Sequence, residues 1–284
     1  MRDVPKAKYM KNKIGIIGFG NMGSAIAERI KSRYRIFVFD KDTNKLANLS
    51  GINITRSSTD LVNKIDLVIL AVKPQDFEPL LKEIKDKVNN KLIISIAAGI
   101  TTKYIENILG MVRVVRVMPN IGAIVGKAVS YICKGRFSRA KDLKLSIKLF
   151  NFIGHTLILS ENLMHAATAV GGSGPGFWGY LFDKKPREEW DKYKSDYFIP
   201  EFSSAAKSVG FDDKTARLTA DFVTIASISA TEALHITPGE LTKKVASRGG
   251  TTEAGLEVLQ KGGSLTDAVK AALKRAEELS KKIE

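Results

Sequence analysis

Cysteine and histidine are scarce in this sequence of 284 residues, which contains one cysteine and three histidines. The cysteine, Cys133, has no partner for a disulfide, which fits a reducing cytosol. It lies in an apolar run, so we expect an unreactive core side chain. The histidines show no spacing that pairs them with an acid, a nucleophile or a zinc motif. The sequence therefore predicts no metal site and no catalytic histidine.

Long apolar runs are also lacking. No stretch reaches the roughly 20 apolar residues that a membrane span requires. Residues 1–12 are polar and basic, without the apolar core of a signal peptide, and we expect a loose tail there. These observations predict a cytoplasmic protein that does not enter a membrane. With 44% hydrophobic residues the chain has enough apolar side chains for real cores, and its length predicts two modest domains.

Acidic residues are outnumbered by basic ones, 30 against 45, which gives a formal net charge of +15. Nucleic-acid-binding proteins often carry such an excess. Here the lysines are dispersed along helical patterns such as residues 141–148 and 270–282, as on solvated faces. No RNA-binding signature accompanies them. We therefore expect no nucleic-acid partner, and we interpret the charge as a field that attracts an anionic substrate and cofactor.

Strand-like and helical patterns alternate over the first half of the chain. The predicted strands cover residues 13–17, 35–39, 67–72, 92–97 and 112–118. Helices with apolar residues at three- and four-residue spacing are predicted at 21–33, 77–88 and 102–109. Two further strands, 128–132 and 156–159, flank a helix at 140–152 that Gly154 should terminate. This order predicts an α/β fold with a Rossmann-like, doubly wound parallel sheet.

Beyond residue 160 the pattern changes to helical periods with few strand signals. We therefore divide the chain into a dinucleotide-binding, Rossmann-like domain at residues 1–160 and an all-helical domain at residues 161–284. The second domain is expected to hold the substrate.

A glycine-rich motif, Gly18-Phe19-Gly20-Asn21-Met22-Gly23, follows the first predicted strand and opens a helical pattern. This is the context that a dinucleotide-binding loop requires. Gly18 would make the tight turn, Gly20 would let the pyrophosphate approach, and Gly23 would let the helix pack on the strand. The alternative is a tight turn without a ligand.

Asp40 ends the second predicted strand. At this place an acidic side chain accepts hydrogen bonds from the ribose hydroxyls and repels a 2′-phosphate. Lys41 follows, and its ammonium can partly neutralise such a phosphate. We expect both residues to contact the cofactor and NADH to be favoured over NADPH.

Three loops after predicted strands carry small, rigid or polar residues suited to pack against adenosine or nicotinamide. Such loops open onto the binding crevice of a doubly wound sheet. They are Ala71-Val72-Lys73-Pro74-Gln75, Ala97-Ala98-Gly99 and Met118-Pro119-Asn120. Taken singly, each loop also fits a simple strand end or a surface charge.

The hexad Ser247-Arg248-Gly249-Gly250-Thr251-Thr252 precedes another apolar-periodic run. Its glycines let the backbone approach a ligand closely. Thr251 or Thr252 can cap the helix that follows, and first-turn N–H groups then face a carboxylate. An ordinary capped helix start is the alternative. Because a dinucleotide loop lies at the other end of the chain, we favour a site for an anionic substrate.

Four motifs together resemble those of the pyrroline-5-carboxylate reductases, the enzymes of the last step in proline biosynthesis. They are Ile17-Gly18-Phe19-Gly20-Asn21-Met22-Gly23, Ala71-Val72-Lys73-Pro74-Gln75, Arg116-Val117-Met118-Pro119-Asn120, and Gly172-Ser173-Gly174-Pro175 with Gly249-Gly250-Thr251-Thr252. The last pair is far more specific than the glycine loop. The resemblance implies hydride transfer from NAD(P)H to a cyclic imine, and a helical domain that forms a homodimer, with larger rings of dimers in some members.

The resemblance also implies roles for individual residues. Thr252 would be the catalytic residue and place its hydroxyl near the imine nitrogen. Gly172 to Pro175 would form a break between helices, and Pro119 and Asn120 would border the nicotinamide. A protonated imine is already electrophilic, so it needs orientation more than a strong acid. The residues that would bind the substrate are Ser173, Ser247, Gly249, Gly250, Thr251 and Thr252.

Two features depart from the family pattern. Arg248 stands where the family usually has proline, and it either adds a charge contact to the substrate carboxylate or relaxes the loop. Residues 183–200 form a longer connection than the family's, with ten charges, five of each sign, and four aromatic side chains. We interpret this stretch as an amphipathic excursion, which is either a solvated insertion or a change to dimer packing or ring assembly.

Two other functions share this architecture. A β-hydroxyacid dehydrogenase would carry a catalytic lysine shortly after its glycine-rich helical motif, but the residues that follow Gly174 include no lysine before Lys184. A non-catalytic, nucleotide-sensing regulator would not need the intact GGTT segment. Both fit the sequence less well than the reductase.

Overall fold

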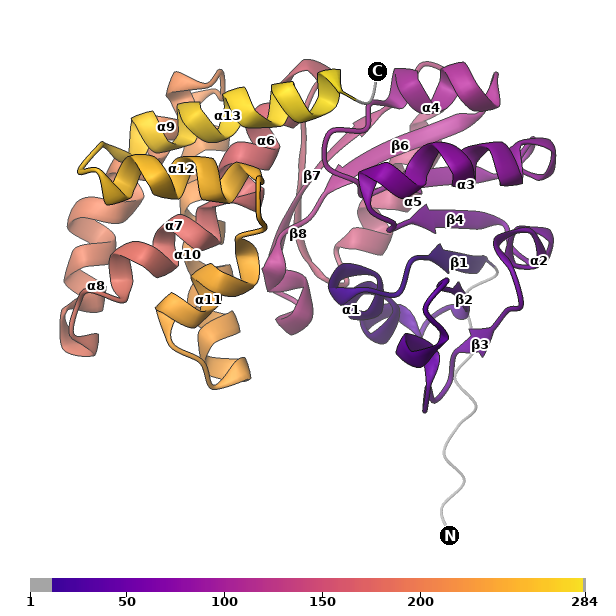
Figure 1. Ribbon diagram of the computed structural model, residues 1–284, viewed down its shortest axis with the longest axis horizontal. Helices are drawn as coiled ribbons and strands as arrows, with labels where there is room; N and C mark the ends of the chain where they lie inside the picture. The colour runs from indigo at the N-terminus through magenta and orange to yellow at the C-terminus, as the bar shows by residue number, and fades with distance from the viewer. Residues whose placement is uncertain (1–11, 283–284) are drawn as a thin grey trace, which may run out of the picture.

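The computed structural model describes residues 12–282, in which a sheet and a set of helices lie side by side (Figure 1). The predicted loose tail lies outside the described residues, apart from Asn12. Within the described part of the chain, no helix combines the length and the apolar character that crossing a membrane requires.

Eight strands form the sheet within the described residues. They are β1 Lys13–Ile17, β2 Arg35–Phe39, β3 Asn53–Ile54, β4 Leu67–Leu70, β5 Leu92–Ser95, β6 Arg113–Met118, β7 Ala128–Lys134 and β8 Gly154–Ile158. Their order across the sheet is β3-β2-β1-β4-β5-β6-β7-β8. This order confirms the predicted Rossmann-like, doubly wound fold.

One strand pair departs from the parallel arrangement. β6 and β7 are antiparallel, whereas every other neighbouring pair is parallel. Residues 119–127 connect the two strands, and this connection is shorter than the dozen or so residues that a parallel crossover takes. The chain therefore turns back on itself at this point.

Helices cover both faces of the sheet. They are α1 Asn21–Ile30, α2 Ser58–Lys64, α3 Phe77–Ile84, α4 Thr102–Leu109 and α5 Ala140–Phe150. Because successive side chains of a strand point to opposite faces, Ile16 of β1 packs in the cluster with Ile26 of α1 and Leu149 of α5. Ile17 lies in the other cluster, where Phe77 of α3 contributes. The carboxyl ends of the strands are left open for a ligand.

Two predictions for the first half need correction. β3 and α2 were not expected, because β3 has only two residues and α2 is a short polar helix. Gly154 does not terminate the preceding helix, since α5 ends at Phe150 and Gly154 is the first residue of β8. Its φ is +151°, and a Cβ there would lie 2.0 Å from the Ala128 carbonyl oxygen. Close backbone approach between β7 and β8 explains this glycine.

From Met164 to Lys281 the described chain consists of helices joined by short turns. Its α-helices are α6 Met164–Ala167, α7 Gly174–Phe182, α8 Trp190–Tyr193, α9 Ile199–Ser208, α10 Asp213–Leu234, α11 Pro238–Val245, α12 Thr251–Gln260 and α13 Leu265–Lys281. Side chains of β7, such as Tyr131, pack in the main helical core. The Tyr131 hydroxyl also donates to Thr219 of α10 at 3.0 Å. The division into two domains at residue 160 stays a prediction.

Short segments of other helical types join these elements. The 3-10 helices are η1 Thr43–Leu46, η2 Pro74–Asp76, η3 Lys85–Lys87, η4 Ile121–Val125, η5 Glu161–Leu163 and η7 Arg187–Glu189, and the π-helices are η6 Thr168–Gly172 and η8 Lys194–Phe198.

The amphipathic character predicted for residues 183–200 is confirmed, whereas their greater length relative to the family's connection stays a prediction. These residues form η7, α8 and η8, and their aromatic side chains Trp190 and Phe198 are buried. Both rings pack against Phe182 of α7 with centroids 5.7 Å away. Charged side chains such as Lys192 and Glu188 face solvent. The effect of this stretch on dimer packing stays a prediction.

Candidate active site

The glycine loop between β1 and α1 has three glycines with different reasons to be there. Gly18 has φ +95°, and a Cβ on it would lie 2.5 Å from the Ala71 carbonyl oxygen. A Cβ on Gly23 would lie 2.0 Å from the Gly18 carbonyl oxygen. At Gly20 a Cβ would meet no atom within 4 Å. The protein's own packing thus requires Gly18 and Gly23, whereas Gly20 faces open space that a ligand can use.

The N-terminus of α1 is suited to bind an anion. Gly20 is its N-cap residue, and no side chain caps the first-turn N–H groups. Uncapped N–H groups and the positive end of the helix dipole favour a negatively charged group such as a pyrophosphate.

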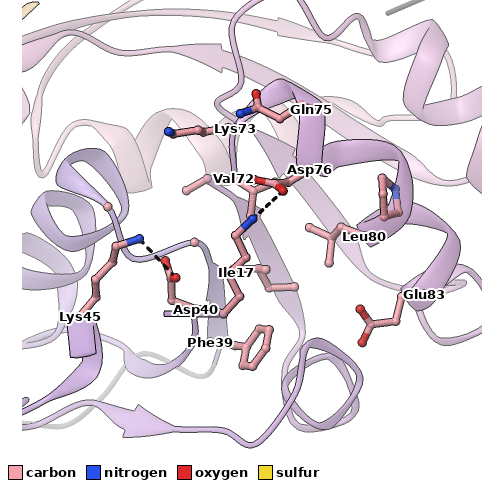
Figure 2. A pocket seen from close by; sticks show the side chains of 15 residues that line it. Ile17, Phe39, Asp40, Lys45, Val72, Lys73, Gln75, Asp76, Leu80 and Glu83 are labelled. Atoms are coloured by element: carbon pink, nitrogen blue, oxygen red, sulfur yellow. Dashed lines mark hydrogen bonds and ion pairs between the residues drawn. The ribbon is translucent and has the colours of Figure 1, made fainter. Parts of the chain in front are cut away.

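Asp40 fastens the glycine loop from the end of β2. Its Oδ2 accepts from the Phe19 N–H at 2.6 Å, and its Oδ1 accepts from the Asp42 N–H at 2.8 Å. The Lys45 ammonium lies 3.4 Å from Oδ1 (Figure 2). Burial alone would raise the pKa of Asp40, but these hydrogen bonds and the charge of Lys45 outweigh it and hold the pKa below its ordinary value. Asp40 is therefore a carboxylate at neutral pH.

A cavity of about 620 Å³ opens at the carboxyl ends of β1, β2 and β4 (Figure 2). Its ionisable side chains are three lysines and three carboxylates, so its formal charge balances although the chain carries +15. Lys41 is paired with Asp76 at 2.7 Å across this cavity. The lining residues are Ile17, Gly18, Gly20, Phe39, Asp40, Lys41, Lys45, Ala71, Val72, Lys73, Gln75, Asp76, Pro79, Leu80 and Glu83.

The second glycine-rich segment leads into α12. Gly250 is the N-cap residue, and no side chain caps the helix. The expectation that Thr251 or Thr252 caps it is therefore wrong, because both threonines lie inside the first turn. Their hydroxyls turn to Ser173 instead: Thr252 donates to it at 3.1 Å, and Thr251 shares a hydrogen bond with it at 2.9 Å. The first-turn N–H groups are left uncapped, as an anion site needs.

A second cavity, of about 660 Å³, has walls from both halves of the molecule. Ala98 and Gly99 come from the loop after β5, and Ser247, Gly250 and Thr251 come from the segment before α12. Gln75 and Pro79 line both cavities, so the two adjoin. The full lining is Pro74, Gln75, Glu78, Pro79, Ala98, Gly99, Tyr104, Thr168, Ser247, Gly250, Thr251, Ala276, Leu279 and Lys282.

The structure thus gathers about half of the predicted site residues at the two cavities. The predicted cofactor residues that line one of them are Gly18, Gly20, Asp40, Lys41, Ala71, Val72, Lys73, Pro74, Ala98 and Gly99. Those that line neither are Phe19, Asn21, Met22, Gly23, Ala97, Met118, Pro119 and Asn120. Of the predicted substrate residues, Ser247, Gly250 and Thr251 line the second cavity, whereas Ser173, Gly249 and Thr252 line neither cavity.

Sequence reasoning missed several lining residues. Lys45 and Asp76 stand near the predicted loops, but no motif marks them. Ala276 and Leu279 come from α13 and Lys282 is its C-cap residue, and the helical pattern gives no sign that α13 reaches the cavity.

The expected helix break before α7 takes the form of a π-helix. η6 ends at Gly172, and Ser173 then leads into α7, which begins at Gly174. π-Helical turns often occur at functional sites. Here the turn places the fully buried Ser173 beside the two threonines of α12.

Asn120, the N-cap residue of η4, follows β6 and has hydrogen-bond partners for only part of its side-chain amide. Its Oδ1 accepts from the N–H groups of Gly122 and Val129, at 3.2 and 3.3 Å. Its Nδ2 is buried and has no hydrogen-bond partner among the described residues. Such a donor in a native structure calls for an explanation, and the described residues give none, because Asn120 lines neither cavity.

The other reactive side chains stand apart from both cavities. Cys133 is buried, and burial raises the pKa of its thiol, which agrees with an unreactive core residue. His155 stacks on Phe222 at 4.2 Å, and none of the three histidines lines either cavity.

Among residues 12–282, no three His, Cys, Asp or Glu side chains gather as metal ligands. Lys184 donates to the Tyr180 hydroxyl at an exposed position, so it offers no dehydrogenase-type catalyst in the cavity.

Fold and site together define an oxidoreductase of Rossmann type with a helical second half. Residues 13–99 match the family model for NADP oxidoreductases, coenzyme F420-dependent. Residues 196–282 match the model for pyrroline-5-carboxylate reductase dimerisation.

The pyrroline-5-carboxylate reductase of Methanosarcina acetivorans is 34% identical over 283 residues, which cover 95% of this chain and 98% of the relative. The reductase of Arabidopsis thaliana is 31% identical and covers 94% of this chain and 95% of its own. Among solved structures, Plasmodium falciparum pyrroline carboxylate reductase with NADP bound has a TM-score of 0.63 at 25% identity, covering 96% and 99% of the two chains. The Streptococcus pyogenes enzyme has a TM-score of 0.61 at 28% identity, covering 95% and 98%. The chain belongs to the pyrroline-5-carboxylate reductase family.

Proposed function

We propose that this chain reduces pyrroline-5-carboxylate to L-proline with a reduced pyridine nucleotide. The observation that carries the proposal is the second cavity, whose walls combine the loop after β5 with the segment before α12. In a doubly wound sheet the dinucleotide lies across the carboxyl ends of the strands, which brings the nicotinamide towards this cavity. Membership of the reductase family supports the same reaction.

The first cavity fits the adenosine half of the cofactor. The uncapped start of α1 suits the pyrophosphate, and the open space at Gly20 lets that group approach the backbone. We assign Asn120, whose buried Nδ2 is unpaired among the described residues, to the nicotinamide end because the family resemblance implies it. We assign cofactor contacts to Gly18, Phe19, Gly20, Asn21, Met22, Gly23, Asp40, Lys41, Ala71, Val72, Lys73, Pro74, Ala97, Ala98, Gly99, Met118, Pro119 and Asn120.

The substrate carboxylate is assigned to the start of α12. The first-turn N–H groups of Thr251 and Thr252 and the Ser247 hydroxyl surround the uncapped positive end of the helix. Gly249 and Gly250 give the segment its turn, and Gly249 has φ +69°.

The hydroxyl groups of Ser173, Thr251 and Thr252 form a chain that orients the imine. The Thr252 hydroxyl donates to Ser173, so its oxygen keeps lone pairs for the N–H of a protonated imine. When bound, the reduced nicotinamide supplies the hydride that the imine carbon accepts. The iminium is already electrophilic, so these residues act by holding it in line and need no strong general acid.

Cofactor choice follows from the charge balance of the first cavity. Asp40 stays ionised and faces the place where a ribose 2′-substituent would lie, and Lys41 is occupied by Asp76. A 2′-phosphate would add about two negative charges to this balanced site. We therefore propose a preference for NADH, to be measured as kcat/KM for each nucleotide. A tenfold advantage for NADPH would overturn it.

A homodimer is proposed as the working assembly. The segment that matches the dimerisation model includes α10, on which Ile225 is 45% exposed. The match to the dimerisation model carries this proposal, and Ile225 is chosen as the probe because it is an exposed apolar side chain within the matched segment. Light scattering should give twice the chain mass, or a multiple if dimers form rings. Ile225→Glu should shift the mass towards the monomer.

The activity is tested by the oxidation of NADH with five- and six-membered cyclic imino acids. We expect turnover with pyrroline-5-carboxylate and formation of proline. NADH binding without turnover on any imine would favour a nucleotide-sensing regulator. Oxidation of a β-hydroxy acid instead would favour the dehydrogenase alternative.

A further inference from the structure

The helix α13 contacts both walls of the second cavity. Near its middle, Arg275 Nε donates to the Gly249 carbonyl at 2.8 Å. Near its end, the Ser280 hydroxyl donates to the Gly99 carbonyl at 2.6 Å. Gly249 belongs to the proposed carboxylate-binding segment, and Gly99 belongs to the loop after β5. Figure 1 shows α13 extending from the helical part to the sheet.

The residues between these contacts form part of the cavity wall. Ala276 and Leu279 line the cavity, and residues 275, 276, 279 and 280 follow the three- and four-residue spacing of one helix face. The same face therefore carries both anchors and the apolar surface between them.

α13 is itself firmly placed. A capping box of Ser264 and Asp267 closes its N-terminus, and Leu265, Val269 and Ala272 are buried in the helical core that includes α12. The helix and the start of α12 consequently belong to one packed unit. Ser280 is 4% exposed, so its contact with Gly99 is shielded from water.

Both backbone polar groups of Gly249 are hydrogen-bonded to side chains. Its N–H donates to the Glu253 carboxylate at 2.6 Å, and its carbonyl accepts from Arg275. The positive φ of Gly249, +69°, turns the backbone at this residue. We expect the two hydrogen bonds to fix the direction in which the chain continues. The N–H groups of Thr251 and Thr252 follow directly after this turn.

We propose that α13 is a strut between the two walls, in which Arg275 and Ser280 are positioning residues for the hydride transfer. Arg275 aims the carboxylate-binding segment, and Ser280 fixes that unit against the loop that borders the nicotinamide. Neither side chain lines the cavity, so they act through Gly249 and Gly99. The inference rests on the proposed function for its catalytic meaning.

A strut predicts a loss in kcat with little loss in cofactor binding. A misplacement of about 1 Å can slow a reaction by roughly 100-fold, because hydride transfer depends on the approach of two bound groups. For Ser280→Ala we expect kcat with pyrroline-5-carboxylate to fall roughly tenfold and the NADH dissociation constant to stay within about twofold. Ser280→Thr keeps the hydroxyl and should recover most of the lost rate.

Matched controls separate positioning from general destabilisation. Ser138 is also buried and also donates to a backbone carbonyl at 2.6 Å, that of Val114, but it lies outside both cavities. Ser138→Ala should lower thermal stability as Ser280→Ala does and leave kcat unchanged. For Arg275→Lys, the control is Glu278→Gln, which removes the 3.1 Å ion pair of Arg275 without touching Gly249.

Hydrogen exchange of the NADH complex tests the strut without turnover. Ser280→Ala should speed amide exchange at residues 97–101 and also at 249–253, whereas Ser138→Ala should change neither segment. Equal kcat losses in Ser280→Ala and Ser138→Ala, or faster exchange confined to residues 97–101, would overturn the strut. If the unmodified chain fails to turn over pyrroline-5-carboxylate while the two segments still respond together, the proposed function fails and the strut stands.

Discussion

The two glycine-rich helix starts of this chain are held in different ways. Both α1 and α12 begin after a glycine N-cap without a capping side chain. At α1, a Cβ on Gly18 or Gly23 would collide with backbone oxygens. At α12, the atom nearest to a Cβ on Gly250 would be the Ser247 hydroxyl oxygen, which belongs to a side chain that can move. The carbonyl of Gly249 accepts a hydrogen bond from Arg275. Close backbone contacts fix the first loop, and Asp40 adds one side-chain fastening from β2, whereas the second loop depends mainly on side chains, among them Arg275 of α13.

This difference suits the two ligands proposed. A pyrophosphate needs a fixed set of N–H groups that approach it closely, and backbone sterics provide that. A small cyclic imino acid must be aligned with the nicotinamide, so its loop is hydrogen-bonded to Ser173, the N-cap residue of α7, and to Arg275 of α13. The comparison predicts that changes to the first loop act on binding and changes to the second act on rate.

The largest effect is expected in the first loop. Gly23→Ala forces the Gly18 backbone to move, so we expect NADH affinity to fall roughly 100-fold, about 3 kcal/mol, together with a lower melting temperature. Gly20→Ala is the matched variant, since its Cβ meets nothing in the protein. It should weaken NADH binding while leaving the melting temperature unchanged. Fluorescence titration and thermal unfolding measure both, and full NADH affinity in Gly20→Ala would break the assignment of that space to the pyrophosphate.

In the second loop, Thr252→Ala should lower kcat/KM for pyrroline-5-carboxylate. The loss of one hydrogen bond to a charged group, ~1.5–3 kcal/mol, corresponds to roughly 10- to 100-fold. NADH binding should stay unchanged. Thr252→Ser keeps the hydroxyl and should recover most activity. Unchanged kcat/KM in Thr252→Ala would remove that hydroxyl from the mechanism.

Asp40→Asn tests the fastening of the first loop. The substitution weakens the hydrogen bonds from the Phe19 and Asp42 N–H groups, so unfolding free energy at pH 7 should fall by ~1–3 kcal/mol. The pKa of Asp40 is lowered in the folded state, so its contribution is present above the ordinary value near ~3.9 and is lost as the pH falls through the folded-state pKa. The stability gap between the two proteins in urea unfolding should therefore narrow in acid. A gap independent of pH would contradict this reading of Asp40.

The smallest effect is expected for Arg248. Its side chain is exposed, and no hydrogen bond or ion pair holds it within the described part of the chain. Arg248→Ala should raise the KM for the substrate less than about threefold, as for a weak exposed charge. A tenfold higher KM for Arg248→Ala, together with a KM of the unmodified protein that rises at high salt, would instead show a direct contact with the substrate carboxylate.

Local patterns made most of the fold predictable. Most of the long strands are recognisable because they contain buried apolar runs, and the glycine loop is recognisable because its backbone sterics require glycines at a fixed spacing. β3 was missed because two residues carry no period. The antiparallel turn between β6 and β7 was missed because strand patterns do not encode direction.

Contacts between distant residues set the limit for the site. The GGTT segment was recognisable, but the 181-residue separation of Ser280 and Gly99 leaves no local pattern to read. The same holds for Ser173 and Thr252, whose hydrogen bond depends on how α7 and α12 pack. The capping role expected of the threonines failed for this reason, since their hydroxyls are used by a helix far away in sequence.

The central claim is that one cavity brings a reduced nicotinamide and a cyclic imino acid together. The direct measurement is NADH oxidation in a stopped-flow mixture with pyrroline-5-carboxylate, with proline quantified in the same samples. The account predicts one proline formed for each NADH consumed, at a rate that saturates with substrate. Tight NADH binding with no substrate-dependent oxidation and no proline would contradict it.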